Sequence, residues 1–150
     1  MEEMQTIAEL AKKYDAYVVT DEVYEHIVYA PNKHIYMQSL EGMRERTIVC
    51  NSLSKTYSIT GWRLGYVIAN PQIIDRVKKV HDFLTVGAAA PLMEAAVVGL
   101  EFGDGYYDEL AAHYAHMKEV FVGGLKKLGL KYTDPQGCLL YTSPSPRDPK

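Results

Sequence analysis

The sequence has only two cysteines, Cys50 and Cys138, and they form no Cys-x-x-Cys pair. A disulfide scaffold needs several paired cysteines, and a structural zinc site needs clustered cysteine or histidine ligands. The low cysteine content therefore argues against both kinds of small, cross-linked domain. It is typical of proteins in the reducing cytoplasm, and we expect this chain to be cytoplasmic.

Long apolar runs and an excess of positive charge are also missing. No stretch approaches the roughly 20 apolar residues that cross a bilayer. The start, Met1-Glu2-Glu3-Met4, lacks the basic and apolar regions of a signal peptide. The formal net charge is −3, with acidic and basic residues interspersed, whereas nucleic-acid binding needs a concentrated positive surface. We therefore expect neither a membrane nor a nucleic acid as a partner.

What the sequence does contain is alternating helical and β-rich patterns, with 47% hydrophobic residues overall. Helical spacing of apolar residues predicts a helix over 3–14, and β-branched runs predict strands at 17–20, 47–51 and 64–69. About a dozen residues separate the last two strands, which is short for a parallel crossover. The predicted fold class is α/β, with a mixed, mostly parallel sheet and flanking helices.

Three further helices are predicted after the sheet strands. The first begins with Asn70 as N-cap and Pro71 at the first helical position, and Gly129 supplies the C-terminal cap of the last one. Their expected ranges are 71–84, 91–102 and 106–128. By contrast, no N-cap precedes the first helix of the chain, so we expect the sequence to begin inside a helix of a longer protein.

Polar residues gather where the predicted strands end. Asp21 follows the first strand, Ser52 and Lys55 follow the second, and Arg63 precedes the antiparallel third. Parallel strands end on the same edge of a sheet, and an antiparallel neighbour begins there. Open α/β sheets bind ligands at this edge, so these side chains form the candidate site.

Two motifs in this region carry a family resemblance. The stretch SLSKTYSITGWRLGY at 52–66 resembles the lysine motif of the class I/II aminotransferases of fold type I, and DEVYEHIVY at 21–29 resembles their aspartate motif. The resemblance covers residues 1–137. The sequence around GWRLGY is most similar to that of the branch with aspartate, aromatic, kynurenine and methionine-type aminotransferases. This similarity does not determine the substrate.

The resemblance implies pyridoxal 5′-phosphate as cofactor, with a role for each polar residue. Lys55 would form the Schiff base and move the proton at the substrate α-carbon. Asp21 would pair with the pyridinium nitrogen and keep it protonated. Tyr24 would hydrogen-bond the 3-oxygen of the cofactor. The alternatives are a surface lysine in a turn, an aspartate that caps a helix and a tyrosine of the core.

The same resemblance assigns the cofactor phosphate to Ser52 and Arg63, with Ser54 as a weaker candidate. The guanidinium suits a phosphate because its hydrogen bonds are charge-assisted and can be bidentate. A structural ion pair is the alternative role for Arg63. No metal site is expected, because His113 and His116 lie one helical turn apart without a third ligand nearby.

The expected function is transfer of an amino group between an L-amino acid and a 2-oxo acid, by an enzyme that the resemblance implies is a homodimer. Two alternatives stay open: a cysteine-S-conjugate β-lyase on the same scaffold, and a non-catalytic truncated fragment. The family's N-terminal arm and its arginine for the substrate carboxylate have no counterpart here. We therefore expect the chain as given to be incomplete and inactive.

Residues 138–150 differ from the rest, because they form a Ser/Pro-rich run without periodicity. Their start, Cys-Leu-Leu-Tyr-Thr-Ser, resembles the translation of a transposon-end sequencing adapter. We expect 1–137 to be a fragment of the cofactor-binding large domain with the start of the small C-terminal domain, and 138–150 to be a non-native tail. A natural disordered tail is the alternative.

Overall fold

The computed structural model describes residues 1–138 and divides the chain into two compact units. Of the described residues, the first unit contains 1–23 and 35–101, and the second contains 24–34 and 102–138. Among residues 1–138, none of the helices combines the length and the apolar character needed to cross a membrane.

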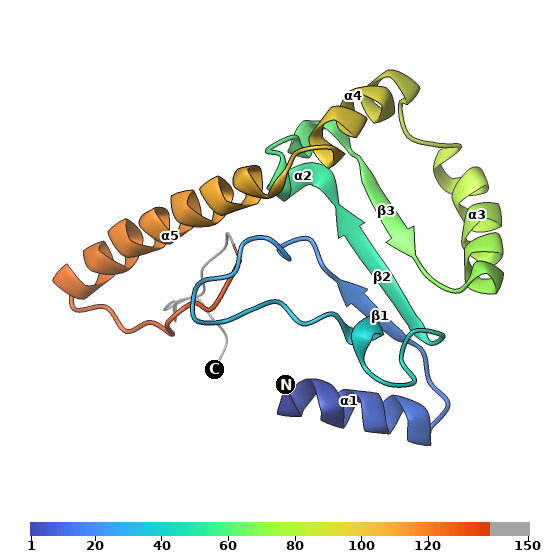
Figure 1. The fold of residues 1–150 in the computed structure, drawn as a ribbon, viewed down its shortest axis with the longest axis horizontal. Helices are drawn as coiled ribbons and strands as arrows, with labels where there is room; N and C mark the ends of the chain where they lie inside the picture. The colour runs from blue at the N-terminus through green and yellow to red at the C-terminus, as the bar shows by residue number, and fades with distance from the viewer. Residues whose placement is uncertain (139–150) are drawn as a thin grey trace. The chain divides into compact units, whose positions relative to one another are not determined.

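The first unit is built on a three-stranded sheet in the order β1 (Val18–Asp21), β2 (Thr47–Ser52) and β3 (Gly65–Ile68). Figure 1 shows β2 as the central strand. The β1 strand runs parallel to β2, and β3 runs antiparallel to it, with Asp21 opposite Cys50 and Gly65 opposite Ser52. The predicted α/β class and the mixed sheet are confirmed.

Helix α1 (Glu2–Lys13) packs beside β1 through one apolar side. Ala8 and Ala11 are buried one turn apart, against two methionines of the chain between β1 and β2, Met37 and Met43. Met37 begins the short 3-10 helix η1 (Met37–Ser39). Acidic residues in the first turn of α1 and lysines in its last turn match the helix dipole. The predicted first helix is confirmed.

A second small core surrounds the turn after β2. Here the chain forms the short helix α2 (Leu53–Thr56), then the 3-10 helix η2 (Thr60–Trp62), and returns into β3. Leu53, Leu64 and Ala96 are buried together, with Tyr57, Ile59, Trp62 and Leu92 packed around them. Ala96 and Leu92 belong to α4 (Ala90–Leu100), so this helix holds the segment between β2 and β3 in place.

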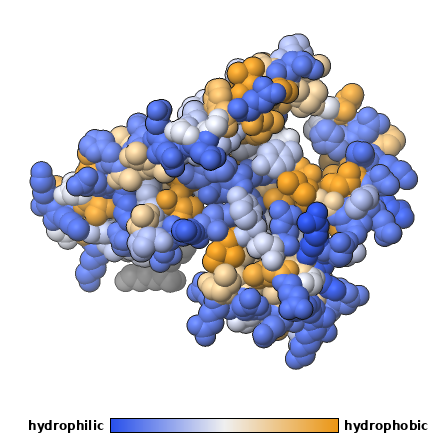
Figure 2. Space-filling view, in the orientation of Figure 1, coloured by the Kyte–Doolittle hydropathy of each residue, from blue (hydrophilic) through white to orange (hydrophobic). Residues whose placement is uncertain are grey.

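Helix α3 (Pro71–Thr85) follows β3 and starts as the sequence predicts. The Asn70 side chain accepts a hydrogen bond from the Gln72 backbone N–H at 3.0 Å, and Pro71 occupies the first turn. Towards its end, α3 leaves Phe83 93% exposed, with other large apolar residues near it on the surface. Figure 2 shows apolar side chains at the surface over α3 and α4.

The second unit contains the long helix α5 (Asp104–Lys127) and two irregular segments, 24–34 and 130–138. Gly129, just past the end of α5, has φ +66°, which is the predicted glycine cap. Val28 and Gly137 form an antiparallel bridge, and the Tyr29 N–H donates to the Gln136 carbonyl at 2.8 Å. These bonds join the two irregular segments to each other.

Candidate cofactor site

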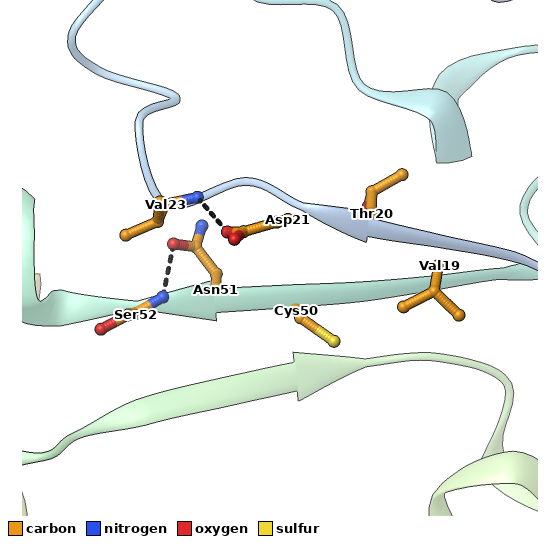
Figure 3. A pocket seen from close by; sticks show the side chains of 7 residues that line it. All are labelled: Val19, Thr20, Asp21, Val23, Cys50, Asn51 and Ser52. Atoms are coloured by element: carbon orange, nitrogen blue, oxygen red, sulfur yellow. Dashed lines mark hydrogen bonds between the residues drawn. The ribbon is translucent and has the colours of Figure 1, made fainter. Parts of the chain in front are cut away.

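An open hollow of about 500 Å³ lies at the carboxyl ends of β1 and β2 in the first unit. Figure 3 shows its polar side chains where the two strands end, with Cys50 further back along β2. It is the edge at which the sequence places the site. The lining residues are Val19, Thr20, Asp21, Val23, Cys50, Asn51 and Ser52.

Asp21 is the last residue of β1, and its carboxylate is exposed to this hollow. One carboxylate oxygen, Oδ1, accepts a hydrogen bond from the Val23 backbone N–H at 3.2 Å. This bond, two residues along the chain, turns the backbone away from the sheet after the strand. No helix follows directly, so Asp21 does not cap one, and its carboxylate can also accept a hydrogen bond from a ligand.

Ser52 ends β2 and begins α2. Its Oγ accepts a hydrogen bond from the Ser54 backbone N–H at 3.1 Å, which makes Ser52 the N-cap of this helix. Lys55 lies within α2, partly exposed, between the buried residues Ser54 and Thr56. Because its neighbours in the sequence are buried, the position of the Lys55 backbone is fixed relative to the end of β2.

Arg63 follows η2 in a left-handed backbone conformation, with φ 56° and ψ 42°. Such a conformation costs roughly 1–2 kcal/mol for a residue with a side chain. The side chain is exposed, and its Nη1 donates to the Thr60 carbonyl at 3.0 Å. The next residue, Leu64, has a carbonyl that accepts from the Ser52 hydroxyl at 3.1 Å. Arg63 therefore adjoins a residue bonded to Ser52.

The structure brings together part of the predicted set. Asp21 and Ser52 line the hollow, while Lys55 and Arg63 lie on the turn after β2 and do not line it. Tyr24 belongs to the second unit, in the turn at 23–26, where its carbonyl accepts from the Ile27 N–H at 2.9 Å.

Two polar residues near these strand ends were not predicted. Asn51 lines the hollow, and its side-chain Oδ1 accepts from the Ser52 N–H at 2.7 Å. Glu22, which follows Asp21, is 4% exposed. Asn51 directly precedes Ser52, and Glu22 directly follows Asp21. This adjacency in the sequence could have identified both residues as candidates for the site. Among residues 1–138, no three potential metal ligands from histidine, cysteine, aspartate and glutamate gather as a metal site would require.

Comparison with known proteins decides the family. The family model for aminotransferase class I and II matches residues 1–148. The chain belongs to this family. The match extends beyond residue 137, into the segment 138–150 that is predicted from its composition to be a non-native tail. Residues 139–150 lie outside the described part of the chain, and that assignment stays a prediction.

Individual relatives support the same assignment. The chain is 35% identical to a putative aminotransferase, YugH, of Bacillus subtilis strain 168, over 96% of this chain and 37% of the relative. It is 36% identical to human kynurenine–oxoglutarate transaminase 3, over 91% of this chain and 32% of that protein. This aminotransferase-family chain therefore spans about a third of the length of these relatives.

Solved structures confirm the predicted fold, that of the fold type I aminotransferases. An aromatic aminotransferase from Pyrococcus horikoshii OT3 superposes with a TM-score of 0.84 at 33% identity. An N-succinyldiaminopimelate aminotransferase from Mycobacterium tuberculosis gives 0.88 at 30% identity. Each match covers 91% of this chain, and 37% and 36% of the solved chains, respectively.

Proposed function

We propose that the full-length protein is a pyridoxal 5′-phosphate-dependent aminotransferase, of which this chain is a central part. It transfers an amino group between an L-amino acid and a 2-oxo acid. The observation that carries the proposal is the position of Lys55 in a chain of this family. It lies three residues beyond Ser52, on the helix that follows β2, while the neighbouring parallel strand ends on Asp21.

The donor set fits this cofactor group by group. The cofactor has an aldehyde, a pyridine nitrogen and a phosphate, which call for an amine, an acid and hydrogen-bond donors. Lys55 provides the amine, and Asp21 provides a carboxylate open to the hollow. Ser52 provides a hydroxyl before the segment that joins β2 to β3, and Arg63 provides a guanidinium at the end of that segment. Tyr24 is the proposed donor to the 3-oxygen.

The chemistry then divides between the cofactor and the chain. When bound, the cofactor withdraws electrons from the substrate α-carbon through its pyridine ring. Asp21 stabilises the positive charge of the ring nitrogen, because a nearby negative charge favours the protonated form. Lys55 would hold the cofactor through its amine, and the same amine would move the proton from and to the substrate α-carbon. Ser52 and Arg63 fix the phosphate end.

We also propose that the full-length protein is a cytoplasmic homodimer. Large apolar side chains are exposed in the first unit, and either the rest of the polypeptide or a second copy of the protein would cover them. Among them are Val80, Phe83, Leu84, Val86, Met93 and Val98. The relatives include an aspartate aminotransferase and a kynurenine–oxoglutarate transaminase, which supports amino acids and 2-oxo acids as the proposed substrates of the full-length protein.

Lys55→Ala in the full-length protein tests the proposal. We expect the wild type to gain visible absorbance with the cofactor and to retain the cofactor after borohydride reduction. Lys55→Ala should lose both properties, and its transaminase rate should fall at least about a thousandfold, because the covalent link and the proton carrier are lost together. Lys126→Ala, an exposed lysine in the last turn of α5, is the matched control.

Two outcomes would point elsewhere. Normal turnover by Lys55→Ala would remove the proposal. Release of pyruvate and ammonia from a cysteine S-conjugate, without need for a 2-oxo acid, would indicate a β-lyase instead. Product analysis of the wild type with and without 2-oxoglutarate separates the two activities.

A further inference from the structure

Ser54 is a buried hydroxyl residue beside the proposed phosphate end of the site. It is 6% exposed, and its Oγ lies 2.7 Å from the Oγ of Ser52. Its backbone carbonyl accepts from the Ile59 N–H at 3.1 Å and from the Thr60 hydroxyl at 3.3 Å. Because these bonds fix Ser54 on its backbone side, its hydroxyl is held against Ser52 and is shielded from solvent.

Counting hydrogens shows what this pair of hydroxyls can do. The Ser52 Oγ has one hydrogen and two lone pairs. One lone pair accepts from the Ser54 N–H at 3.1 Å. The single hydrogen can go to the Leu64 carbonyl at 3.1 Å or to the Ser54 Oγ at 2.7 Å, but not to both. When it goes to the carbonyl, the Ser54 hydroxyl is free to donate into the second lone pair of Ser52.

The same count applies when an anion accepts the hydrogen of Ser52. A phosphate oxygen can only accept, so Ser52 must then turn its hydrogen away from both protein acceptors. The Ser54 hydroxyl donates to Ser52 in that arrangement, and both lone pairs of Ser52 are filled. A hydroxyl that accepts hydrogen bonds becomes a stronger donor, because consecutive bonds polarise one another.

We propose that Ser54 is a positioning residue that acts through Ser52. Its hydroxyl orients the Ser52 hydroxyl towards the phosphate of the cofactor and strengthens that hydrogen bond, without touching the cofactor itself. This inference rests on the proposed function, and it changes the role of Ser54 from a weak phosphate ligand to a support for the ligand beside it.

The test compares two ligands in apo full-length protein: pyridoxal 5′-phosphate, and pyridoxal, which lacks the phosphate. Affinities are measured by absorbance or fluorescence titration. Ser54→Ala should weaken pyridoxal-phosphate binding about three- to tenfold, the range expected for one net hydrogen bond, and leave pyridoxal binding unchanged. Ser39→Ala, which removes the hydroxyl that donates to the Tyr36 carbonyl in η1, is the control with no effect on either ligand.

A double-mutant cycle supplies the decisive outcome. If Ser54 acts through Ser52, Ser54→Ala should have no further effect on pyridoxal-phosphate affinity in a Ser52→Ala protein. An effect of Ser54→Ala that persists there, or that is equal for both ligands, would overturn the inference. Ser54→Cys, which keeps the shape with a weaker donor, should give an intermediate loss and serves if the alanine variant does not fold. A wild type that binds neither ligand would instead reject the proposed function itself.

Discussion

Asp21 is the residue whose charge the proposed chemistry most depends on. Its carboxylate has two separable tasks: Oδ1 holds the turn through the Val23 N–H, and the negative charge is available at the hollow. Asparagine keeps an oxygen for the turn and removes the charge. A substitution of this kind distinguishes a structural aspartate from a cofactor ligand.

We therefore expect Asp21→Asn in the full-length protein to fold normally and to lose about a hundredfold or more in kcat, the usual scale for removing one electrostatic contact from an active site. Asp21→Glu should retain more activity, because it keeps the charge. The measurements are kcat with a fixed amino-acid donor and the melting temperature. An Asp21→Asn protein with a wild-type rate would show that Asp21 only shapes the turn.

At the scale of single residues, the sequence predicted which polar residues end the two parallel strands, but it did not predict their hydrogen bonds. Asp21 and Ser52 were predicted at the strand ends, and both line the hollow. The pairing of the Ser52 and Ser54 hydroxyls could not be predicted, because it depends on the geometry of α2. The left-handed backbone of Arg63 was equally hidden, since arginine has no preference for that conformation.

Among the elements, the contact between β2 and β3 allows no side chain at Gly65. A Cβ added there would lie 2.6 Å from the Asn51 carbonyl oxygen, which is closer than real Cβ atoms come. The obstacle is backbone, so it cannot move aside as a flexible side chain would. Gly65 is opposite Ser52 in the register, and a displaced β3 would move the end of the strand that carries the site.

Gly65→Ala should consequently destabilise the full-length protein by about 1–3 kcal/mol, the usual range for overpacking, and weaken cofactor binding as well. Gly61→Ala is the matched control in the same motif, because a Cβ there would meet no atom within 4 Å. Thermal unfolding and cofactor titration of both variants provide the measurement. Equal melting temperatures for the two variants would contradict the close approach.

The elements that the sequence predicted well are those with strong local signals. The first helix, the three strands and the Asn70 cap of α3 have the expected places. Helix α2, which carries Lys55, was not predicted, because four residues are too few to show a helical period. It forms because Ser52 caps it and because Leu53 joins the core around Leu64 and Ala96.

In the second unit, Lys118 joins α5 to the segment that follows it. Its Nζ donates to the Pro135 carbonyl at 2.7 Å and forms an ion pair with Asp134 at 3.3 Å. It also lies 4.9 Å from the centre of the Tyr29 ring, a favourable cation–π distance. The Lys118 side chain is 21% exposed, whereas that of Asp134 is largely exposed, so the ion pair contributes little and the carbonyl bond more.

Lys118→Met should loosen this segment, because it removes a charged hydrogen bond worth about 1.5–3 kcal/mol while keeping the apolar stem. Hydrogen exchange of the full-length protein can detect the change, since the Tyr29 N–H is bonded to the Gln136 carbonyl. We expect faster exchange at Tyr29 in Lys118→Met and nearly unchanged exchange in Asp134→Asn. Unchanged exchange in Lys118→Met would show that the backbone bonds alone hold the segment.

On the scale of the whole molecule, the described part of the chain exposes many large apolar side chains. Both faces of β3 carry exposed residues, Val19 of β1 is 66% exposed, and the end of α3 has Phe83 and Leu84 at the surface. The relatives are about three times as long as the stretch they share with this chain. Further residues of the same polypeptide, or a second copy of the protein, would cover these exposed apolar side chains.

Expressed as residues 1–150 alone, the chain should associate or remain partly unfolded, because exposed apolar side chains and the edge strands of the described sheet, β1 and β3, favour contact with other chains. Added pyridoxal 5′-phosphate should produce no stoichiometric visible absorbance, and amino-acid donors with 2-oxoglutarate should give no turnover. The proposed site would have Lys55 and Asp21 but would lack the rest of the protein that encloses the cofactor.

Size-exclusion chromatography, thermal unfolding and cofactor titration of the purified chain test this. A monomer that melts cooperatively and turns over substrate would show that the 150 residues alone are sufficient for the activity.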